Sequence, residues 1–230
     1  AAARRGEIRI YLTPHIPVPA DWLGDLAGRD VLGLASGGGQ QGPLLAAAGA
    51  NVTIFDNSDA QLQRDADAAD RFDLHIATVQ GNMQDLACFA DAAFDLIVHP
   101  VSNVFIDDVL PVWREAYRVL RPGGSLLSGF VNPVMYMLDW DALEAGKPLE
   151  LRHAIPYADP ESLPPEVKQT YLSDQVPFEF GHSLGDLVGG QIAAGFVITG
   201  FYEDKGEPTL DPFIDPFIST RAVKVGSVCL

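Results

Sequence analysis

A glycine-rich turn is the part of the sequence most suited to holding a ligand. The residues ASGGG at 35–39 follow a short apolar segment and precede a helical pattern. Glycine has no side chain, so the backbone can approach a ligand closely, and free amides at the helix start can donate to it. Gly37, Gly39 and Gly42 also satisfy the G-x-G-x-x-G pattern of dinucleotide sites, with Asp56 at the expected spacing. The turn predicts a nucleotide-type ligand but does not distinguish a nicotinamide dinucleotide from other cofactors that contain a ribose.

Histidine side chains are the next candidates for chemistry, because imidazole titrates near neutral pH. His99 ends the apolar segment 94–99 and is followed by Pro-Val-Ser-Asn. At the end of a buried strand it could remove a proton from a substrate, contact a cofactor, or bind the backbone. His182, just before a helical pattern, is a weaker candidate base.

A parallel sheet is expected to position these residues. Short apolar segments alternate with helical patterns over 30–130, which is typical of βαβ units. The sequence therefore predicts an α/β, Rossmann-like, doubly wound sheet of seven strands, mostly parallel, with helices on both faces. The predicted strands are 30–34, 51–55, 74–78, 94–99, 124–130, 196–203 and 219–225.

The connections between these strands carry their own signals. Apolar residues at helical spacing predict a helix over 109–120, which Arg121-Pro122-Gly123-Gly124 should end. Ser183 and Asp186 form a capping box for a short helix that reaches about residue 194. Prolines between the last two strands indicate an antiparallel C-terminal strand. The segment 132–180, rich in prolines and aromatic residues, predicts an inserted cap between strands five and six.

Composition limits the partners of the chain. The formal net charge is −16, and such a protein repels the phosphates of nucleic acids. No apolar run is long enough to span a membrane, so we expect a cytoplasmic protein with one domain over 1–230. Cys88 and Cys229 lack metal-ligand spacing, and both are expected to be reduced thiols.

Several motifs occur together in the order and spacing of one family. They are the turn at 35–39, GNMQD at 81–85, FDLIV at 94–98 and LRPGG at 120–124. Over about 30–130 the sequence resembles class I S-adenosylmethionine-dependent methyltransferases, in particular the methyltransferase type 11 or ubiquinone-biosynthesis-like group. The resemblance implies an enzyme that uses S-adenosylmethionine and releases S-adenosylhomocysteine.

Two alternatives stay open beside this resemblance. An NAD(P)-dependent oxidoreductase of Rossmann type would use the same turn, although the chain has no Tyr-x-x-x-Lys pair and is too short for a separate substrate domain. A catalytically silent protein with the methyltransferase fold would bind partners without transferring a methyl group.

The resemblance also implies roles for individual residues. The turn should approach the methionine part of the cofactor, Asp56 should bind the ribose, and Asn82 should accept from the adenine amino group. Gly33 and Ala35 depart from the acidic residue and the glycine that the family usually has there. The implied cofactor-binding residues are Ala35, Gly37, Gly38, Gly39, Gln40, Asp56, Asn57, Gln61, Asn82, Met83 and His99.

The methyl acceptor is expected above the same edge of the sheet. The cap 132–180 and an N-terminal arm at 1–29 should cover it. Their aromatic side chains either contact a small molecule that receives the methyl group by in-line transfer or form a small separate core beneath the long connection. Carboxylates do not cluster near Asn103 and Asn132, so no metal is predicted. We expect a monomer or a homodimer. The candidate substrate residues are Tyr11, Asn103, Asn132, Tyr136 and Trp140.

Overall fold

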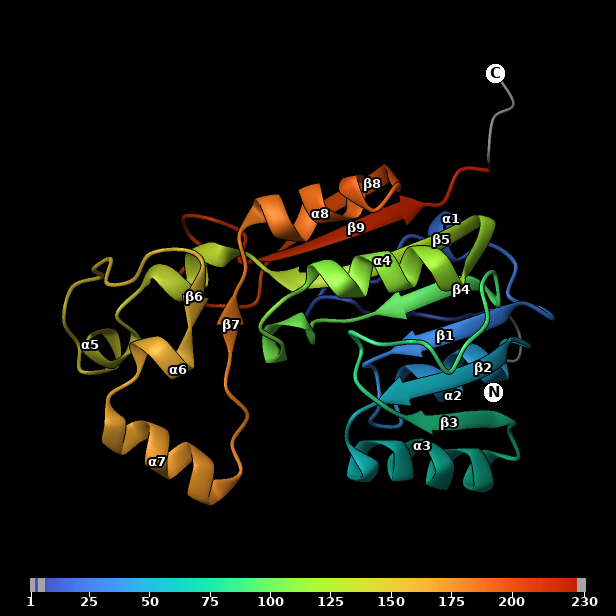
Figure 1. The fold of residues 1–230 in the computed structure, drawn as a ribbon, viewed down its shortest axis with the longest axis horizontal. Helices are drawn as coiled ribbons and strands as arrows, with labels where there is room; N and C mark the ends of the chain where they lie inside the picture. Colours follow the sequence, from blue (N-terminus) through green and yellow to red (C-terminus); the bar gives the residue numbers. More distant parts are fainter. Residues whose placement is uncertain (1–2, 4–6, 227–230) are drawn as a thin grey trace.

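A seven-stranded sheet forms the centre of the computed structural model, which describes residue 3 and residues 7–226 without the side chains at 141 and 144. The strand order is β3-β2-β1-β4-β5-β9-β8 (Figure 1). β1 to β5 pair in parallel, and β9 runs antiparallel between β5 and β8, which confirms the predicted fold. The strands are β1 (Asp30–Leu34), β2 (Asn51–Asp56), β3 (Ile76–Gln80), β4 (Phe94–His99), β5 (Leu120–Val131), β8 (Val197–Asp204) and β9 (Phe217–Val223).

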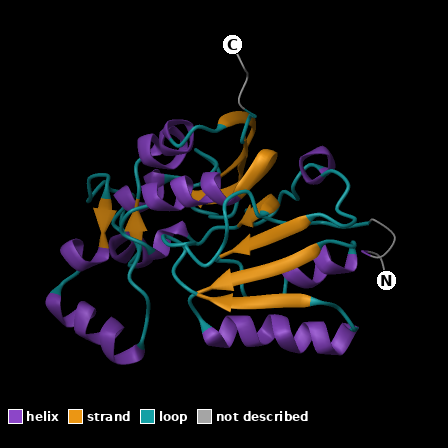
Figure 2. Ribbon diagram, turned by 45° about the vertical axis from the view of Figure 1, so that its right-hand side comes forward, coloured by secondary structure: helices purple, strands orange, loops and turns teal. Residues whose placement is uncertain are grey.

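The central strands send side chains alternately into two separate cores. From β1, Leu32 and Leu34 pack into one core and Val31 into the other. In β4, Ile97 and Val98 divide in the same way. Because successive side chains of a strand point to opposite faces, both faces must be covered. Figure 2 shows helices on both sides of the strands. The helices around the sheet are α1 (Ala20–Leu23), α2 (Gln41–Ala47), α3 (Asp59–Phe72), α4 (Leu110–Val119) and α8 (Gly190–Ala193).

Helix α4 fills the first core. Trp113 and Ala116 are fully buried, as the apolar periodicity predicted, and the helix ends at Val119 before the proline and glycines. The indole Nε1 of Trp113 donates to the carbonyl of Asp186 at 2.9 Å. Asp186 belongs to a π-helical turn, η4 (Gly185–Gly189), which continues into α8. The helix predicted here exists, and one bond of the predicted capping box is present, because the Asp186 amide donates to Ser183 Oγ at 3.1 Å. The Asp186 carboxylate accepts from the Ser183 hydroxyl at 2.7 Å rather than from a backbone amide.

The third strand begins two residues later than predicted. The apolar pattern suggested 74–78, whereas β3 pairs with β2 from Ile76 opposite Val52 to Gln80 opposite Asp56. β3 is at the edge of the sheet and has only β2 as a neighbour. Its limits therefore follow the register with β2 rather than its own apolar content.

The segment 132–180 forms small elements of its own between β5 and η4. In Figure 1 they lie to the left, beyond the carboxyl ends of the parallel strands. β6 and β7 pair with each other in a separate two-stranded sheet. The elements are η3 (Pro133–Met137), α5 (Trp140–Glu144), β6 (Tyr157–Ala158), α6 (Asp159–Ser162), α7 (Pro165–Asp174) and β7 (Phe180–Gly181).

The N-terminal arm is held to the sheet by one buried carboxylate. Asp204, at the end of β8, accepts from the Thr13 hydroxyl at 2.7 Å and from the amides of His15 and Ile16 at 2.8 and 2.9 Å. Burial acts to raise the pKa of Asp204, but these donors outweigh it and hold the pKa below its ordinary value of 3.8. Residues 1–2 and 4–6 of the predicted arm and Cys229 lie outside the described residues, and Cys88 is an exposed free thiol.

We predict that docking of the arm weakens in acid through Asp204. A carboxyl whose pKa is lower in the folded state stabilises the fold above its unfolded value and loses that contribution as the pH falls through the folded value. Urea unfolding of Asp204→Asn should show a free energy about 1 to 3 kcal/mol below the parent at pH 7. The difference should shrink below pH 3.8, where the parent carboxyl becomes protonated. Equal stability of the two proteins at pH 7 would contradict the assignment.

Candidate cofactor and acceptor site

The glycine turn has the backbone conformation that its sequence predicts. It leaves β1 at Leu34, with Gly38 and Gly39 at φ of 131° and 74°. A Cβ at Gly39 would lie 2.9 Å from the carbonyl oxygen of Arg64, and one at Gly37 would lie 2.8 Å from the Cβ of Gln61. Helix α3 therefore packs directly against the turn, which only glycine permits at this distance.

The amides of this turn already have acceptors, contrary to the expectation that they are free for a ligand. The Gly37 amide donates to Asp56 Oδ2 at 2.9 Å. The amides of Gly38 and Gly39 donate to Asp65 Oδ2 at 2.9 and 3.1 Å. Two carboxylates thus satisfy three successive amides, and the turn has no free donor left at these positions for a phosphate.

Asp65 is a residue that the sequence reasoning missed. Its side chain is fully buried, and its Oδ1 has no hydrogen-bond partner within the described part of the chain. Burial raises the pKa of Asp65, the two turn amides oppose this shift, and the nearby charge of Asp56 adds to it. A signal did exist, because Leu62, Asp65 and Ala69 form the buried side of α3. An acid at such a helical position needs a specific partner.

The predicted residues of the adenosine end gather at the carboxyl ends of β2 and β3. Besides its bond to the turn, Asp56 accepts from the Ser58 amide at 3.0 Å. Asn57 is exposed beside it. Asn82 is exposed just after β3, where its Oδ1 accepts from the amide of Gln84, while Met83 is buried in the first core. Asp56 is the last residue of β2 and Asn82 comes just after β3, so the carboxylate and the amide lie at the ends of neighbouring strands.

The N-terminal arm contacts the start of α2, directly after the turn. The Nε2 of Gln41, at the start of α2, donates to the backbone carbonyl of Tyr11 at 2.7 Å. Gln40 is exposed between the turn and α2. This contact places the arm beside the predicted cofactor residues, although the Tyr11 side chain itself is partly exposed.

His99 lies in the core rather than on an open surface. Its side chain is fully buried, with its ring 5.9 Å from the Trp113 ring and nearly perpendicular to it. Nδ1 lies 2.9 Å from the carbonyl oxygen of Leu34, so the neutral ring donates from this nitrogen. Nε2 has no partner among the described residues. Burial lowers the pKa of His99 to about 4, while the bond to Leu34 opposes that shift, so the ring is uncharged at pH 7.

The segment after β4 carries a second buried polar group. Asn103 is 1% exposed, and its Nδ2 has no acceptor in the described residues. The carbonyl of Asn103 accepts from Nε2 of His182 at 3.0 Å, which ties the end of β7 to this segment. An unpartnered buried donor at the carboxyl edge is available to a ligand.

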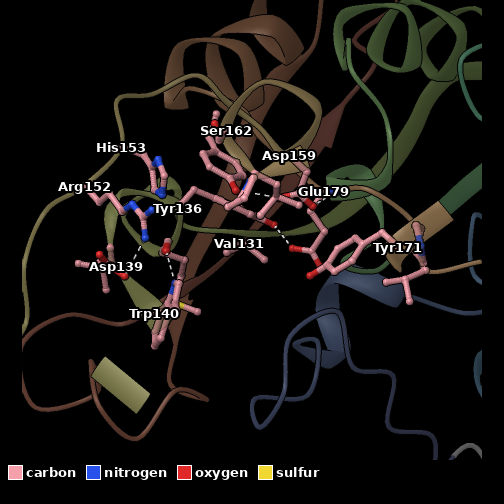
Figure 3. Close-up of a pocket in the computed structure, with 17 residues that line it drawn as sticks. Val131, Tyr136, Asp139, Trp140, Arg152, His153, Asp159, Ser162, Tyr171 and Glu179 are labelled. Atoms are coloured by element: carbon pink, nitrogen blue, oxygen red, sulfur yellow. Dashed lines mark hydrogen bonds and ion pairs between the residues drawn. The ribbon is translucent and has the colours of Figure 1, made fainter. Parts of the chain in front are cut away.

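A cavity of about 370 Å³ lies in the insertion (Figure 3). Of the predicted substrate residues, Tyr136 and Trp140 line it. Asn103, Asn132 and Tyr11 are not among its lining residues. Asn132 instead caps η3, because its Oδ1 accepts from the Val134 amide at 3.2 Å.

The described residues contain no group of three or more His, Cys, Asp and Glu side chains placed to hold a metal ion. None of their helices is both long and apolar enough to cross a membrane.

Comparison with known proteins identifies a family. Residues 32–128 match the family model of the methyltransferase domain. The chain is 54% identical to the uncharacterised methyltransferase YbaJ of Bacillus subtilis (strain 168) over 223 residues, which are 97% of this chain and 87% of that protein.

Solved structures share the fold at low sequence identity. An S-adenosylmethionine-dependent methyltransferase from Mesorhizobium loti aligns with a TM-score of 0.68 and 18% identity, over 88% of this chain and 94% of the other. The cyclase SpnF aligns with a TM-score of 0.62 and 18% identity, over 87% of this chain and 77% of its own. From the relative that spans nearly the whole chain, together with the domain match, we conclude that the chain belongs to the methyltransferase family.

Proposed function

We propose that the chain transfers a methyl group from S-adenosylmethionine to a small molecule held under the insertion. The turn and Asp56 would hold the methionine and ribose parts of the cofactor. Asn57, Gln61, Asn82 and Met83 would border the adenine. When bound, S-adenosylmethionine supplies an electrophilic methyl group for in-line displacement. The chain's own residues then align the acceptor and exclude water.

The occupied amides of the turn carry this proposal. A dinucleotide needs free amides for its pyrophosphate, and here Asp56 and Asp65 accept from those of Gly37, Gly38 and Gly39. Carboxylates beneath the turn repel phosphate and favour a cation such as a sulfonium. The observation supports S-adenosylmethionine over NAD(P), the alternative that the turn sequence left open.

We assign His99 a positioning role in this proposal. A neutral ring with a pKa of about 4 is a weak base at pH 7. Its bond to the Leu34 carbonyl instead fixes the last residue of β1, directly before the turn. His182 positions the insertion in the same way, through its bond to the Asn103 carbonyl.

Cofactor choice is testable by ligand stabilisation. We expect S-adenosylhomocysteine to raise the melting temperature, whereas NAD and NADH should leave it unchanged. In Asp56→Ala the calorimetric affinity for S-adenosylhomocysteine should fall at least about tenfold, because hydrogen bonds to a charged group contribute roughly 1.5 to 3 kcal/mol. Asp70→Ala, which removes an exposed carboxylate on the neighbouring helix α3, serves as the control. Stabilisation by NADH alone would refute the proposal.

The role of Asp65 predicts different results for two substitutions. Asp65→Asn keeps an oxygen that can accept from the Gly38 and Gly39 amides, whereas Asp65→Ala leaves both without an acceptor. We expect the alanine variant to be less stable than the asparagine variant by about 1 to 3 kcal/mol in urea unfolding. It should also bind S-adenosylhomocysteine more weakly. Identical behaviour of the two variants would exclude a role for these hydrogen bonds.

Burial of His99 predicts a pH dependence of folding. The folded pKa of about 4 lies below the ordinary value of 6.5, so between these values the unfolded state binds more protons and stability falls with falling pH. Relative to His99→Asn, which keeps a donor for Leu34 but does not titrate, the parent should lose about 1.4 kcal/mol per pH unit in this window. Urea unfolding at pH 5 and pH 7 measures the difference, and parallel losses would contradict the neutral buried ring.

A further inference from the structure

The cavity in the insertion has aromatic walls. Tyr136 and Tyr157 stack with their ring centres 5.4 Å apart, and the His153 ring meets Tyr157 edge-on at 5.0 Å. Trp140 and Tyr171 also line the cavity, and Figure 3 shows Tyr171 on the far side of it from Trp140. Aromatic faces carry partial negative charge and attract cations.

Two carboxylates are built into the same walls. Glu179 Oε2 accepts from the Tyr136 hydroxyl at 2.7 Å, and Asp159 Oδ1 accepts from the Tyr157 hydroxyl at 2.7 Å. Asp159 Oδ2 accepts from the Glu179 amide at 2.8 Å. Both phenols are donors, and burial together with these acids raises their pKa values. Glu179 Oε1 makes no hydrogen bond to any described residue, so one carboxylate oxygen is left for a ligand.

The side chains that line the cavity carry a net negative charge, apart from those that form an ion pair with each other. Arg152 is the one lysine or arginine among the lining residues, and it pairs with Asp139 at 3.1 Å. No lysine or arginine of the described residues pairs with Glu179 or Asp159. The carboxylates of Glu179 and Asp159 would repel an anion in this cavity. An uncharged ligand would leave the two carboxylates without a positively charged partner.

The cavity is connected to the carboxyl edge of the sheet through direct contacts. A Cβ at Gly181 would lie 2.7 Å from the Tyr136 ring, so Tyr136 packs on β7. The next residue, His182, bonds to the carbonyl of Asn103 after β4. Val131, at the end of β5, also lines the cavity. The cavity therefore borders the region where a methyl acceptor would lie.

We propose that this cavity recognises a small amine through its positively charged ammonium group. The carboxylates of Glu179 and Asp159 provide the counter-charge, and the stacked tyrosines provide the aromatic surface. Apolar lining residues such as Leu138 and Val176 provide a surface for the hydrocarbon part of the amine. This inference rests on the proposed function in one respect, since it makes the ammonium group the part of the methyl acceptor that the cavity recognises.

Two probes of the same shape test the role of charge. Choline carries a quaternary ammonium, and 3,3-dimethylbutan-1-ol replaces that nitrogen with carbon. We expect calorimetry to show choline binding to the parent protein at least about tenfold tighter than the alcohol. Equal or tighter binding of the alcohol, or no binding of choline at millimolar concentration, would overturn the proposal. This comparison uses the parent protein, so it does not depend on the folding of a variant.

Substitution of Glu179 locates the site. Glu179→Gln removes the charge at nearly constant shape and should lower choline affinity about tenfold without changing that of the alcohol. Glu166→Gln, an exposed carboxylate on α7 of the same insertion, should leave both unchanged. Unchanged choline affinity in Glu179→Gln would rule out this cavity.

Cofactor titrations separate the two proposals. S-adenosylhomocysteine should bind the parent and Glu179→Gln with equal affinity, because Glu179 is not among the predicted cofactor residues. If choline binds and S-adenosylhomocysteine does not, the proposed function fails and the amine site stands. If S-adenosylhomocysteine binds and choline does not, the amine site alone fails.

Discussion

The hydrogen bonds between the Asp65 carboxylate and the glycine turn are the interaction on which the site depends. They join α3 to the turn at the end of β1, while Asp56 joins the same turn to the end of β2. Such close packing requires glycine at 37 and 39, because a Cβ there would meet α3 within 3 Å. The arrangement buries the carboxyl group of Asp65, and the cost of burying it is offset only by good hydrogen bonds. The turn is thereby held in shape before any ligand arrives, and its electrostatic character suits a cation.

The residues proposed to hold the cofactor and those that line the cavity come from different parts of the chain. The family model spans 32–128, which contains the turn, Asp56, Asn82 and His99. The arm and the insertion lie outside that range, and the cavity is built almost wholly from the insertion. The shared fold of a methyltransferase and a cyclase is consistent with this division, because a fold positions residues without deciding the reaction. Under the proposed function, selectivity for the acceptor would lie in residues 132–180.

Features with a local cause could be predicted from the sequence. Strands 30–34 and 94–99, helix α4 and the capping box at Ser183 each follow from residues close together in the chain. The partners of buried polar groups could not, because they join distant segments. Asp65 and Gly38 are 27 residues apart, and His99 and Leu34 are 65 apart. The sequence therefore suggested free turn amides and a histidine that titrates near neutral pH. In the structure the amides are paired with Asp56 and Asp65, and burial lowers the pKa of His99. The hydrogen bond between Tyr136 and Glu179 in the cavity joins the two ends of the insertion. The insertion has weak periodicity, and no sequence pattern predicted this bond.

The anchoring of the arm to Asp204 has a consequence for synthesis. Thr13 and Asp204 are 191 residues apart, and the backbone of Leu12 packs so closely on Gly129 of β5 that a Cβ at position 129 would clash with the Leu12 carbonyl oxygen. The bond between Thr13 and Asp204 can form only after β8 has been made, whereas the contacts of the arm with Gln41 and Gly129 need only earlier segments of the chain. The arm can therefore lie against the turn and β5 before β8 exists, and Asp204 completes its attachment afterwards.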